Sequence, residues 1–490
     1  MQQTNQNVPG LVVAGLKGGS GKTVISLGLA AAWRENDLKV APFKKGPDYI
    51  DAGWLSLAAG RSCYNLDTYL CTSSRVQESY LSHSKNCDIA VVEGNRGLFD
   101  GIDLEGRTST AELAKLLHLP LVLVLDCTKS TRTMAALVLG CMHFDPDLNI
   151  VGVILNRVAG KRHHNKVRDN ILHFCNLPVF GAIPKLDSTD FPERHMGLVP
   201  TDEHSLSRDS VAAAARIVRE SIDLEGLYRA CVEAVTNMPV ILPPTLKPKF
   251  PVNSNFLSRT SQSQGSVTPG IGKPRIGIIR DSAFQFYYPD NLEALEACGA
   301  ELCYISPLRE SRIPQVDAIY MGGGFPETHA PQLAANREFA ENLRQLAGAG
   351  LPIYAECGGF IFLGHSLELD GVTYPMSGVL PVKFGLSKRP VGHGYTRARV
   401  VEENPYFKVG EIIRGHEFRY STVVEIDQAR GSMAFSMERG KGIVNGQDGF
   451  FFSRVFATYT HIIATGTPAW AEAILRQARI YQASPESRSL

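Results

Sequence analysis

Short, uninterrupted apolar runs alternate with longer helix-like segments between Leu11 and about Ile183. The runs include LVVAG, KVAPF, DIAVVEG, LVLVLD and IVGVILN, and they lack the alternating polar positions of a strand with one exposed face. Continuous apolar runs are typical of parallel strands that are buried on both faces of a sheet. The pattern predicts a doubly wound α/β domain in the first half of the chain.

A second α/β pattern begins at Arg275, with the runs RIGII, ELCYISP, DAIYMGGG and LPIYAECGG, and continues towards His461. The segment between the two patterns, PPTLKPKFPVNSN followed by SRTSQSQGSVTPG, is rich in Pro, Ser and other polar residues, as linkers are. We therefore expect one domain at residues 8–242, a linker at 243–273 and a second domain at 274–483.

The composition agrees with two globular domains and excludes several classes of protein. At 490 residues the chain exceeds the roughly 250–300 at which one hydrophobic core stops growing. Its formal net charge of +1 gives no reason to expect a nucleic-acid partner. No apolar run reaches the roughly 18 residues of a membrane helix, and the start MQQTNQNVPG is too polar for a signal peptide. Because the ten cysteines form no CxxC pair, we expect a reduced, cytoplasmic protein without a membrane partner.

A glycine-rich loop, KGGSGKT, lies between the strand-like LVVAG and the helix-like VISLGLAAAW. A phosphate-binding loop requires this placement, because backbone N–H groups and the helix N-terminus then face the phosphates. The strict GxxxxGK[ST] pattern fails, since Leu16 stands where its first glycine belongs. The loop instead matches KGGxxK[ST], the variant with a second lysine that partition ATPases carry. The expected nucleotide contacts are Lys17, Gly18, Gly19, Ser20, Gly21, Lys22 and Thr23.

Polar residues also end three other predicted strands: Glu93 follows DIAVV, Asp126 follows LVLVL and Asn156 follows VGVIL. The carboxyl ends of parallel strands form the edge at which ligands bind in such sheets. A carboxylate beside a phosphate loop is well placed to bind Mg²⁺, so Thr23, Asp48 and Glu93 are the predicted metal ligands. Helix capping is the alternative role for the three carboxylates.

The second half contains a cysteine in the setting of a catalytic nucleophile. The strand-like PIYAE runs into Cys357, and two glycines and the helix-like FIFLGHSL follow. A tight turn there presents the thiol at a helix N-terminus, which favours the thiolate. We predict Cys357 as the nucleophile and His461, after VFATYT, as its base; His416 in GHEFRY is a rival base. The backbone N–H groups expected to stabilise an oxyanion are those of Gly323, Gly324 and Gly358.

These motifs make the chain resemble the cobyrinic acid a,c-diamide synthase family over nearly its whole length. The motifs of the first half are FKKGPDYIDAGW, NLDTYL, VVEGNRGLFDG, STAELAKLL, VILNRV and RHMGLVP. Those of the second half are FQFYYPDNLEALEACGAEL, MGGGFPE, YAECGGF and RGHEFRYS. The resemblance implies a P-loop domain related to dethiobiotin synthetase, with a doubly wound parallel sheet, followed by a flavodoxin-like class I glutamine amidotransferase domain.

The resemblance also implies an activity in two parts. Cys357 attacks the side-chain amide of glutamine and releases ammonia, while His461 moves the proton. ATP with Mg²⁺ phosphorylates the a and c acetate carboxylates of a tetrapyrrole, cobyrinate or hydrogenobyrinate, and ammonia converts each acyl phosphate into an amide. Lys44 and Lys45 are expected to face phosphate or substrate carboxylates, and Asn156 the adenine. The sequence leaves open whether the chain forms a homodimer.

Two departures from related proteins leave questions open. Ordinary class I amidotransferase domains carry a Glu two residues after the histidine, whereas Ile462 and Ile463 follow His461, so the group that orients the histidine is not identified. Asn95 and Arg96 stand where many cobyrinate-amidating members have an apolar pair. A sirohaem amidase of the same family is therefore an alternative function, and a neutral surface change an alternative explanation.

A partition-like ATPase switch, in which the nucleotide drives dimerisation, is a more distant alternative. The phosphate loop alone permits it. A switch of this kind has no use for the Cys357 and His461 pair, so the second domain argues against it.

Overall fold

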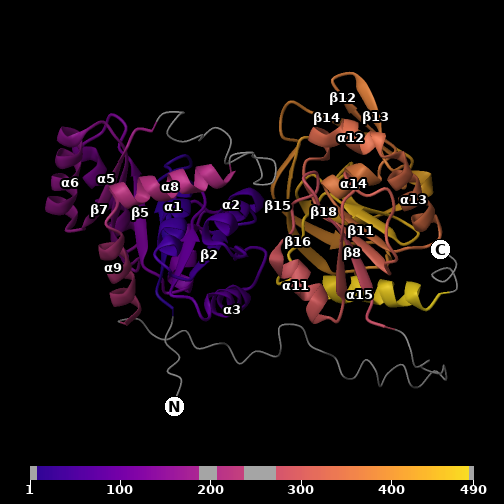
Figure 1. Ribbon diagram of the computed structural model, residues 1–490, viewed down its shortest axis with the longest axis horizontal. Helices are drawn as coiled ribbons and strands as arrows, with labels where there is room; N and C mark the ends of the chain where they lie inside the picture. Colours follow the sequence, from indigo (N-terminus) through magenta and orange to yellow (C-terminus); the bar gives the residue numbers. More distant parts are fainter. Residues whose placement is uncertain (1–7, 187–206, 237–271, 485–490) are drawn as a thin grey trace, which may run out of the picture. The chain divides into compact units, whose positions relative to one another are not determined.

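The computed structural model describes residues 8–186, 207–236 and 272–484 of the chain (Figure 1). The described residues fall into two compact units, one on each side of residue 245. Residues 243–271, which are most of the predicted linker, and the RHMGLVP motif lie outside the described residues. The predicted domain boundaries therefore stay predictions.

The N-terminal unit is built on a seven-stranded sheet in the order β3-β2-β4-β1-β5-β6-β7, and every pair in it is parallel. The strands are β1 (Gly10–Gly15), β2 (Val40–Lys45), β3 (Tyr64–Leu66), β4 (Ile89–Glu93), β5 (Leu121–Asp126), β6 (Ile150–Val158) and β7 (Val179–Pro184). The five apolar runs of the sequence form the five inner strands, so the prediction of a doubly wound parallel sheet is confirmed.

Helices cover both faces of this sheet. One face shares a core with α1 (Lys22–Glu35), α2 (Tyr49–Ala59), α8 (Ser207–Ser221) and α9 (Leu224–Thr236), and Figure 1 shows α8 lying along α1. The helices packed on the other face are α3 (Ser73–Ser84), α4 (Thr110–Leu116), α5 (Arg132–Phe144) and α6 (Lys161–Cys175). On that face Tyr80 of α3 contacts Phe43 of β2, with ring centroids 5.1 Å apart.

The C-terminal unit contains a nine-stranded sheet in the order β16-β15-β18-β19-β20-β11-β10-β8-β9. Its parallel strands are β8 (Arg275–Ile279), β9 (Glu301–Ile305), β10 (Ala318–Met321), β11 (Ile353–Glu356) and β20 (Val455–Thr458). Its antiparallel strands are β15 (Gly392–Val400), β16 (Ile412–Arg419), β18 (Ser432–Arg439) and β19 (Gln447–Phe452). The α/β class of this domain is confirmed. The apolar runs in the sequence did not predict its antiparallel strands.

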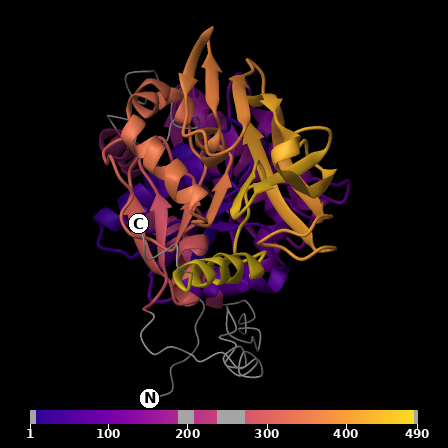
Figure 2. The ribbon, with the colours of Figure 1, turned by 90° about the vertical axis from the view of Figure 1, so that its right-hand side faces the viewer.

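A small second sheet has the order β13-β12-β14-β17. Its strands are β12 (Ser366–Leu369), β13 (Val372–Pro375), β14 (Val382–Leu386) and β17 (Ser421–Ile426), and Figure 2 shows the β12–β13 hairpin extending from the domain. The described residues of this unit also include the short 3₁₀ helices η2 (Pro326–His329) and η3 (Gln428–Arg430). Within the described parts of the chain, no helix is long and apolar enough to cross a membrane.

The large sheet carries a hydrophobic core on each face. Ile353 and Ala355 of β11 face the side of α12 (Ala330–Ala335), α13 (Arg337–Gly348) and α14 (Gly358–Leu363). Tyr354 faces the side of α11 (Pro289–Ala297) and α15 (Ala469–Gln482), and Figure 2 shows α15 running across that end of the domain. Because side chains alternate along a strand, Glu356, the last residue of β11, points to the side of α11. The next residue, Cys357, belongs to the core on the opposite face.

Candidate active sites

The phosphate loop lies between β1 and α1, as the sequence predicts. Gly19 and Gly21 have φ angles of 72° and 93°, which residues with a Cβ rarely adopt. A Cβ on Gly21 would also lie 2.1 Å from Nδ2 of Asn156. Lys22 Nζ donates to the carbonyls of Lys17 (3.2 Å) and Arg96 (2.7 Å), so its ammonium group is held across the loop. Burial lowers the pKa of Lys22.

Thr23, Glu93 and Lys44 meet beside this loop, each from a different element. The Thr23 hydroxyl donates to Glu93 Oε1 at 2.7 Å, and Lys44 Nζ donates to the same oxygen at 2.9 Å. The other carboxylate oxygen of Glu93 is buried without a hydrogen-bond partner among the described residues. Burial raises the pKa of Glu93 to about 7. An orphaned carboxylate oxygen next to a hydroxyl fits a Mg²⁺ ligand set, since this cation binds oxygen.

The two aspartates of the GPDYID segment have different surroundings. Asp48 caps α2, because its side chain accepts the N–H of Asp51 at 2.8 Å, and its role as a metal ligand stays a prediction. Burial raises the pKa of Asp48 to about 6. Asp51 pairs with Lys44, a contact that the sequence interpretation missed. The sequence did contain one sign of this contact, because Asp51 lies about one helical turn after Asp48 and so near the same end of α2.

The remaining predicted residues of this domain lie around the loop. Asn156 donates from Nδ2 to the carbonyl of Ser20 at 2.8 Å, so it braces the loop, and its contact with adenine stays a prediction. Lys17 is exposed, and its Nζ lies 3.5 Å from Oδ2 of Asp126. Lys45 is buried at the end of β2, and burial lowers its pKa.

Cys357 occupies the turn between β11 and α14, with φ 46° and ψ −97°. This backbone conformation is uncommon for a residue that has a Cβ, and it is the strained turn that presents a nucleophile at a helix N-terminus. The Cys357 N–H donates to the carbonyl of Thr458 on the neighbouring β20 at 2.8 Å, which anchors the turn. The structure therefore contains the strand–turn–helix arrangement that the sequence predicts.

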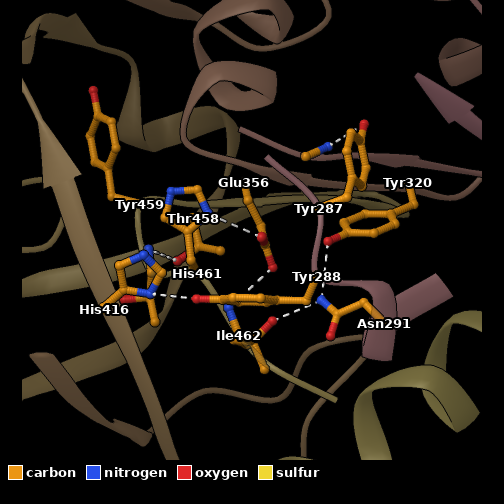
Figure 3. A network of polar contacts seen from close by, with 12 residues as sticks. Tyr287, Tyr288, Asn291, Tyr320, Glu356, His416, Thr458, Tyr459, His461 and Ile462 are labelled. Atoms are coloured by element: carbon orange, nitrogen blue, oxygen red, sulfur yellow. Dashed lines mark hydrogen bonds and ion pairs between the residues drawn. The ribbon is translucent and has the colours of Figure 1, made fainter. Parts of the chain in front are cut away.

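His461 connects this thiol with a buried carboxylate. Nδ1 of the His461 ring donates to Oε2 of Glu356 at 3.2 Å, as Figure 3 shows. The Cys357 side chain interacts with the same ring. Burial by itself lowers the pKa of His461, but Cys357 and Glu356 outweigh burial and raise this pKa to about 10. Burial also raises the pKa of Glu356, whose exposed fraction is 0%. Glu356 is therefore a carboxylate in contact with His461 that the sequence did not identify.

His416, the rival base, lies beside His461 rather than beside the carboxylate. The two ring centroids are 4.9 Å apart, and the backbones of the two histidines exchange hydrogen bonds of 3.1 and 2.8 Å. Nδ1 of His416 lies 3.3 Å from the hydroxyl of Tyr288. Burial and the neighbouring His461 lower the pKa of His416 well below its ordinary value.

The three glycines predicted as oxyanion donors lie together near His461. A Cβ on Gly323 would lie 2.6 Å from Cε1 of His461, and a Cβ on Gly358 would lie 2.9 Å from the nitrogen of Gly324. Gly322, by contrast, donates its N–H to the hydroxyl of Tyr287 at 2.8 Å. The oxyanion role of the three predicted glycines stays a prediction.

Two buried side chains that the sequence interpretation missed support the segment around His461. Asn291 of α11 accepts the N–H of Ala464 at 2.7 Å. Asp448 of β19 accepts the hydroxyls of Thr458 and Thr460 at 2.8 Å each. The one signal for Asp448 was a charged residue in front of the apolar run GFFF.

A doubly wound nucleotide-binding domain and a domain with a cysteine–histidine pair at a strand–helix turn define a two-domain, glutamine-dependent carbon–nitrogen ligase. Two family models agree with this class. Residues 11–199 match the CobQ/CobB/MinD/ParA nucleotide binding domain, and residues 275–469 match the CobB/CobQ-like glutamine amidotransferase domain.

Similar proteins extend the match to nearly the full chain. A cobyrinate a,c-diamide synthase of Magnetococcus marinus is 41% identical, with coverage of 96% of this chain and 97% of the relative. Synthases of the same name from Syntrophotalea carbinolica (95% of this chain, 98% of the relative) and Salmonella typhimurium (96% and 98%) are 36% and 35% identical. The chain belongs to the cobyrinate a,c-diamide synthase family, so the resemblance described above is confirmed.

Proposed function

We propose that the protein catalyses the ATP- and glutamine-dependent amidation of the a and c acetate carboxylates of cobyrinate or hydrogenobyrinate. One observation carries the proposal. The chain holds a hydroxyl–carboxylate pair beside a phosphate loop, Thr23 with Glu93, and a Cys357–His461 pair in its amidotransferase domain. Activation of a carboxylate needs the first pair, and release of ammonia needs the second.

The glutamine half-reaction takes place in the C-terminal domain. His461 accepts the thiol proton, and the Cys357 thiolate attacks the side-chain amide carbon of glutamine. Backbone N–H groups of Gly323, Gly324 and Gly358 stabilise the charge on the amide oxygen. His461 donates the proton to the leaving nitrogen, which departs as ammonia and leaves a thioester. Water, deprotonated by His461, then releases glutamate and restores the thiol.

The synthetic half-reaction takes place in the N-terminal domain. A carboxylate is too poor an electrophile for ammonia, so its oxygen first attacks the terminal phosphorus of ATP and ADP leaves. Lys17 and Lys22 neutralise the charge on the phosphate oxygens. Bound Mg²⁺ supplies further neutralisation, and Thr23, Asp48 and Glu93 are the residues that would hold it. Ammonia then displaces phosphate from the acyl phosphate and forms the amide.

The two consecutive lysines of β2 have separate roles in this proposal. Lys44 is neutralised by Asp51 and Glu93, so it organises the carboxylates beside the phosphate loop. Lys45 is buried one residue further along the strand and binds a carboxylate of the substrate. The Asn156 side chain, which borders the loop, contacts the adenine.

A second candidate is a sirohaem amidase, and Arg96 favours it. This exposed residue has a φ angle of 53°, and its carbonyl accepts the hydrogen bond of Lys22. Besides burial, the positive charge of Arg96 lowers the pKa of Lys45. The guanidinium thus adds positive charge near the end of β2, where a further carboxylate of a different macrocycle can bind.

The test is mass analysis of the macrocycle after incubation with ATP, Mg²⁺ and glutamine labelled with nitrogen-15 at its side-chain amide. Cobyrinate, hydrogenobyrinate and sirohaem are supplied in turn, and the accepted substrate gains labelled amide groups. Cys357→Ala should lose the product with glutamine and retain it with ammonium chloride, whereas Lys22→Ala should lose it with both. If no macrocycle gains an amide, the proposal is wrong.

A further inference from the structure

Two buried histidine rings lie in contact at the amidotransferase site, and their surroundings differ. His461 and His416 are 2% and 6% exposed, and their ring planes are inclined by only 24°. Two adjacent imidazolium ions repel one another, so the neighbouring groups decide which ring carries a proton. Figure 3 shows a hydrogen bond between the carboxylate of Glu356 and the His461 ring, and another between the hydroxyl of Tyr288 and the His416 ring. A carboxylate stabilises an imidazolium ion far more than a hydroxyl does.

The carboxylate of Glu356 is held from several sides. Oε2 accepts the Nδ1–H of His461, and Oε1 accepts the N–H of Ile462 at 3.3 Å. Burial raises the pKa of Glu356, and an interaction with the Tyr320 hydroxyl of β10 opposes this rise. Because both of its oxygens are bonded, the carboxylate cannot turn away from the histidine ring.

The other titratable groups near this carboxylate are neutral or belong to the proposed reaction. Tyr287, Tyr320 and Tyr354 stay protonated, because burial raises the pKa of each phenol. His416 of β16 stays neutral, because burial and His461 lower its pKa. The Cys357 side chain also interacts with the His461 ring.

The position of Glu356 on its strand explains how it reaches the same histidine as the thiol. Glu356 and Cys357 are consecutive, and alternation along β11 sends their side chains to opposite faces of the sheet. His461 follows β20, the parallel neighbour of β11, and so lies between the two side chains. Asn291 and Asp448 hold the chain on either side of this histidine.

We propose that Glu356 is the positioning residue of the glutamine-hydrolysing centre. It keeps the proton on Nδ1 of His461, so that Nε2 is free of a proton and can accept the one from the Cys357 thiol. It also makes His461, rather than His416, the histidine that becomes positively charged. This inference rests on the proposed roles of Cys357 and His461. Glu356 takes the part of the acidic residue that ordinary class I domains carry two residues after the histidine, where this chain has Ile463.

Glu356→Gln tests the inference with little change in shape. The amide oxygen can still accept the N–H of Ile462, but the amide NH₂ then faces Nδ1 of His461, which must become an acceptor. The proton moves to Nε2, the wrong nitrogen for a base acting on the thiol. We expect the kcat for glutamine hydrolysis to fall by about 10²–10⁴-fold with little change in KM, as when other carboxylates that orient a catalytic histidine are removed.

The pH profile and NMR distinguish positioning from a structural role. Without the negative charge the pKa of His461 falls. The protonated ring, which donates to the leaving nitrogen, is then lost at lower pH, so the basic limb of kcat/KM for glutamine hydrolysis moves to lower pH in Glu356→Gln. Nitrogen-15 NMR of labelled histidine should show the Nδ1 proton of His461 in the wild type and its loss in the variant. Urea unfolding of the variant, compared with that of the wild type, controls for folding of the C-terminal domain that carries Glu356.

Two further variants are matched to this one. Tyr320→Phe removes a hydroxyl that accepts from Asn291 and interacts with the same carboxylate, but it keeps the negative charge, so the basic limb stays at the wild-type pH. Glu356→Asp keeps the negative charge, but its shorter side chain places the carboxylate farther from the His461 ring. We therefore expect kcat to fall while the basic limb remains near that of the wild type.

The possible failures are separable. If Cys357→Ala hydrolyses glutamine as fast as the wild type, the proposed nucleophile is wrong and the inference fails with it. If Cys357→Ala is inactive while Glu356→Gln keeps the wild-type kcat and pH profile, only the role of Glu356 is overturned. If Glu356→Gln does not fold, the pH profile of Glu356→Asp tests the role of Glu356 instead. A basic limb displaced to low pH in Glu356→Asp would contradict the proposal.

Discussion

The hydroxyl of Thr23 donates to the carboxylate of Glu93 at 2.7 Å, although the two residues are 70 positions apart in the chain. β4, which ends in Glu93, pairs with β1, and β1 leads through the phosphate loop into Thr23 at the start of α1. The two groups therefore meet at the carboxyl edge of the sheet, where doubly wound folds bind their ligands.

Glu93→Gln should abolish amide formation from either nitrogen source. The neutral amide is a weak ligand for Mg²⁺ and no longer balances the charge of Lys44, with which Glu93 pairs at 2.9 Å. We expect the rate of product formation, followed by mass spectrometry, to fall on the order of 10²-fold or more. Glu225→Gln, an exposed change on α9, is the control and should leave this rate unchanged. Amidation by Glu93→Gln at the wild-type rate would exclude Glu93 from the metal site.

Gly323→Ala should damage the glutamine-hydrolysing centre through steric contact. The new Cβ would lie 2.6 Å from Cε1 of His461, which is closer than real Cβ contacts, so the ring must leave its present position. Overpacking of this kind costs about 1–3 kcal/mol of stability, measurable by urea unfolding, and we expect glutamine hydrolysis to be lost as well.

The matched control is Gly348→Ala, in the last turn of α13 of the same domain. Nothing lies within 4 Å of a Cβ at that position. Stability and glutamine hydrolysis should therefore both be retained. Equal behaviour of the two alanine variants would show that Gly323 is not confined by His461.

His416→Asn should leave the basic limb of glutamine hydrolysis where it is in the wild type. The pKa of His416 is lowered by burial and by His461, so this ring is neutral in the working range and its replacement removes no charge. A displaced basic limb would identify His416 as the histidine whose proton is lost in that limb instead.

The same variant makes a prediction about acid stability. In the wild type the unfolded chain binds a proton at His416 below the ordinary value of 6.5, whereas the folded chain excludes it. Stability is therefore lost as the pH falls below 6.5. His416→Asn should lose less stability over that range, as measured by thermal unfolding at several pH values. Identical losses in both proteins would contradict a neutral, buried His416.

Asp448→Ala should destabilise the C-terminal domain. The carboxylate accepts the hydroxyls of Thr458 and Thr460 and the N–H of Tyr459, all of them buried. Removing it leaves these donors without an acceptor, which costs about 3 kcal/mol or more in urea unfolding. Asp427→Ala, which removes an exposed cap of η3, is the comparison and should cost no more than about 1 kcal/mol. Equal costs would mean that water replaces the carboxylate at Asp448.

The strands that carry the predicted site residues could be read from the chain because their signals are local. Runs such as LVVAG and DIAVV are buried on both faces, and a loop or turn with functional residues follows each of them directly. The position of Cys357 is local for the same reason, since strand, turn and helix are consecutive in sequence. Edge strands such as β3 gave a weaker signal, because they are short and only partly apolar.

The sequence by itself determined the two domains' α/β class, the phosphate loop and the cysteine–histidine pair, because each depends on neighbouring residues. Only the tertiary structure decided which groups surround them. Glu356 and His461 are 105 positions apart, and they meet because β20 pairs with β11. Asp51 joins Lys44 for a similar reason, since α2 packs back onto β2. Strand pairing and helix packing bring such residues together, and no local pattern records that pairing.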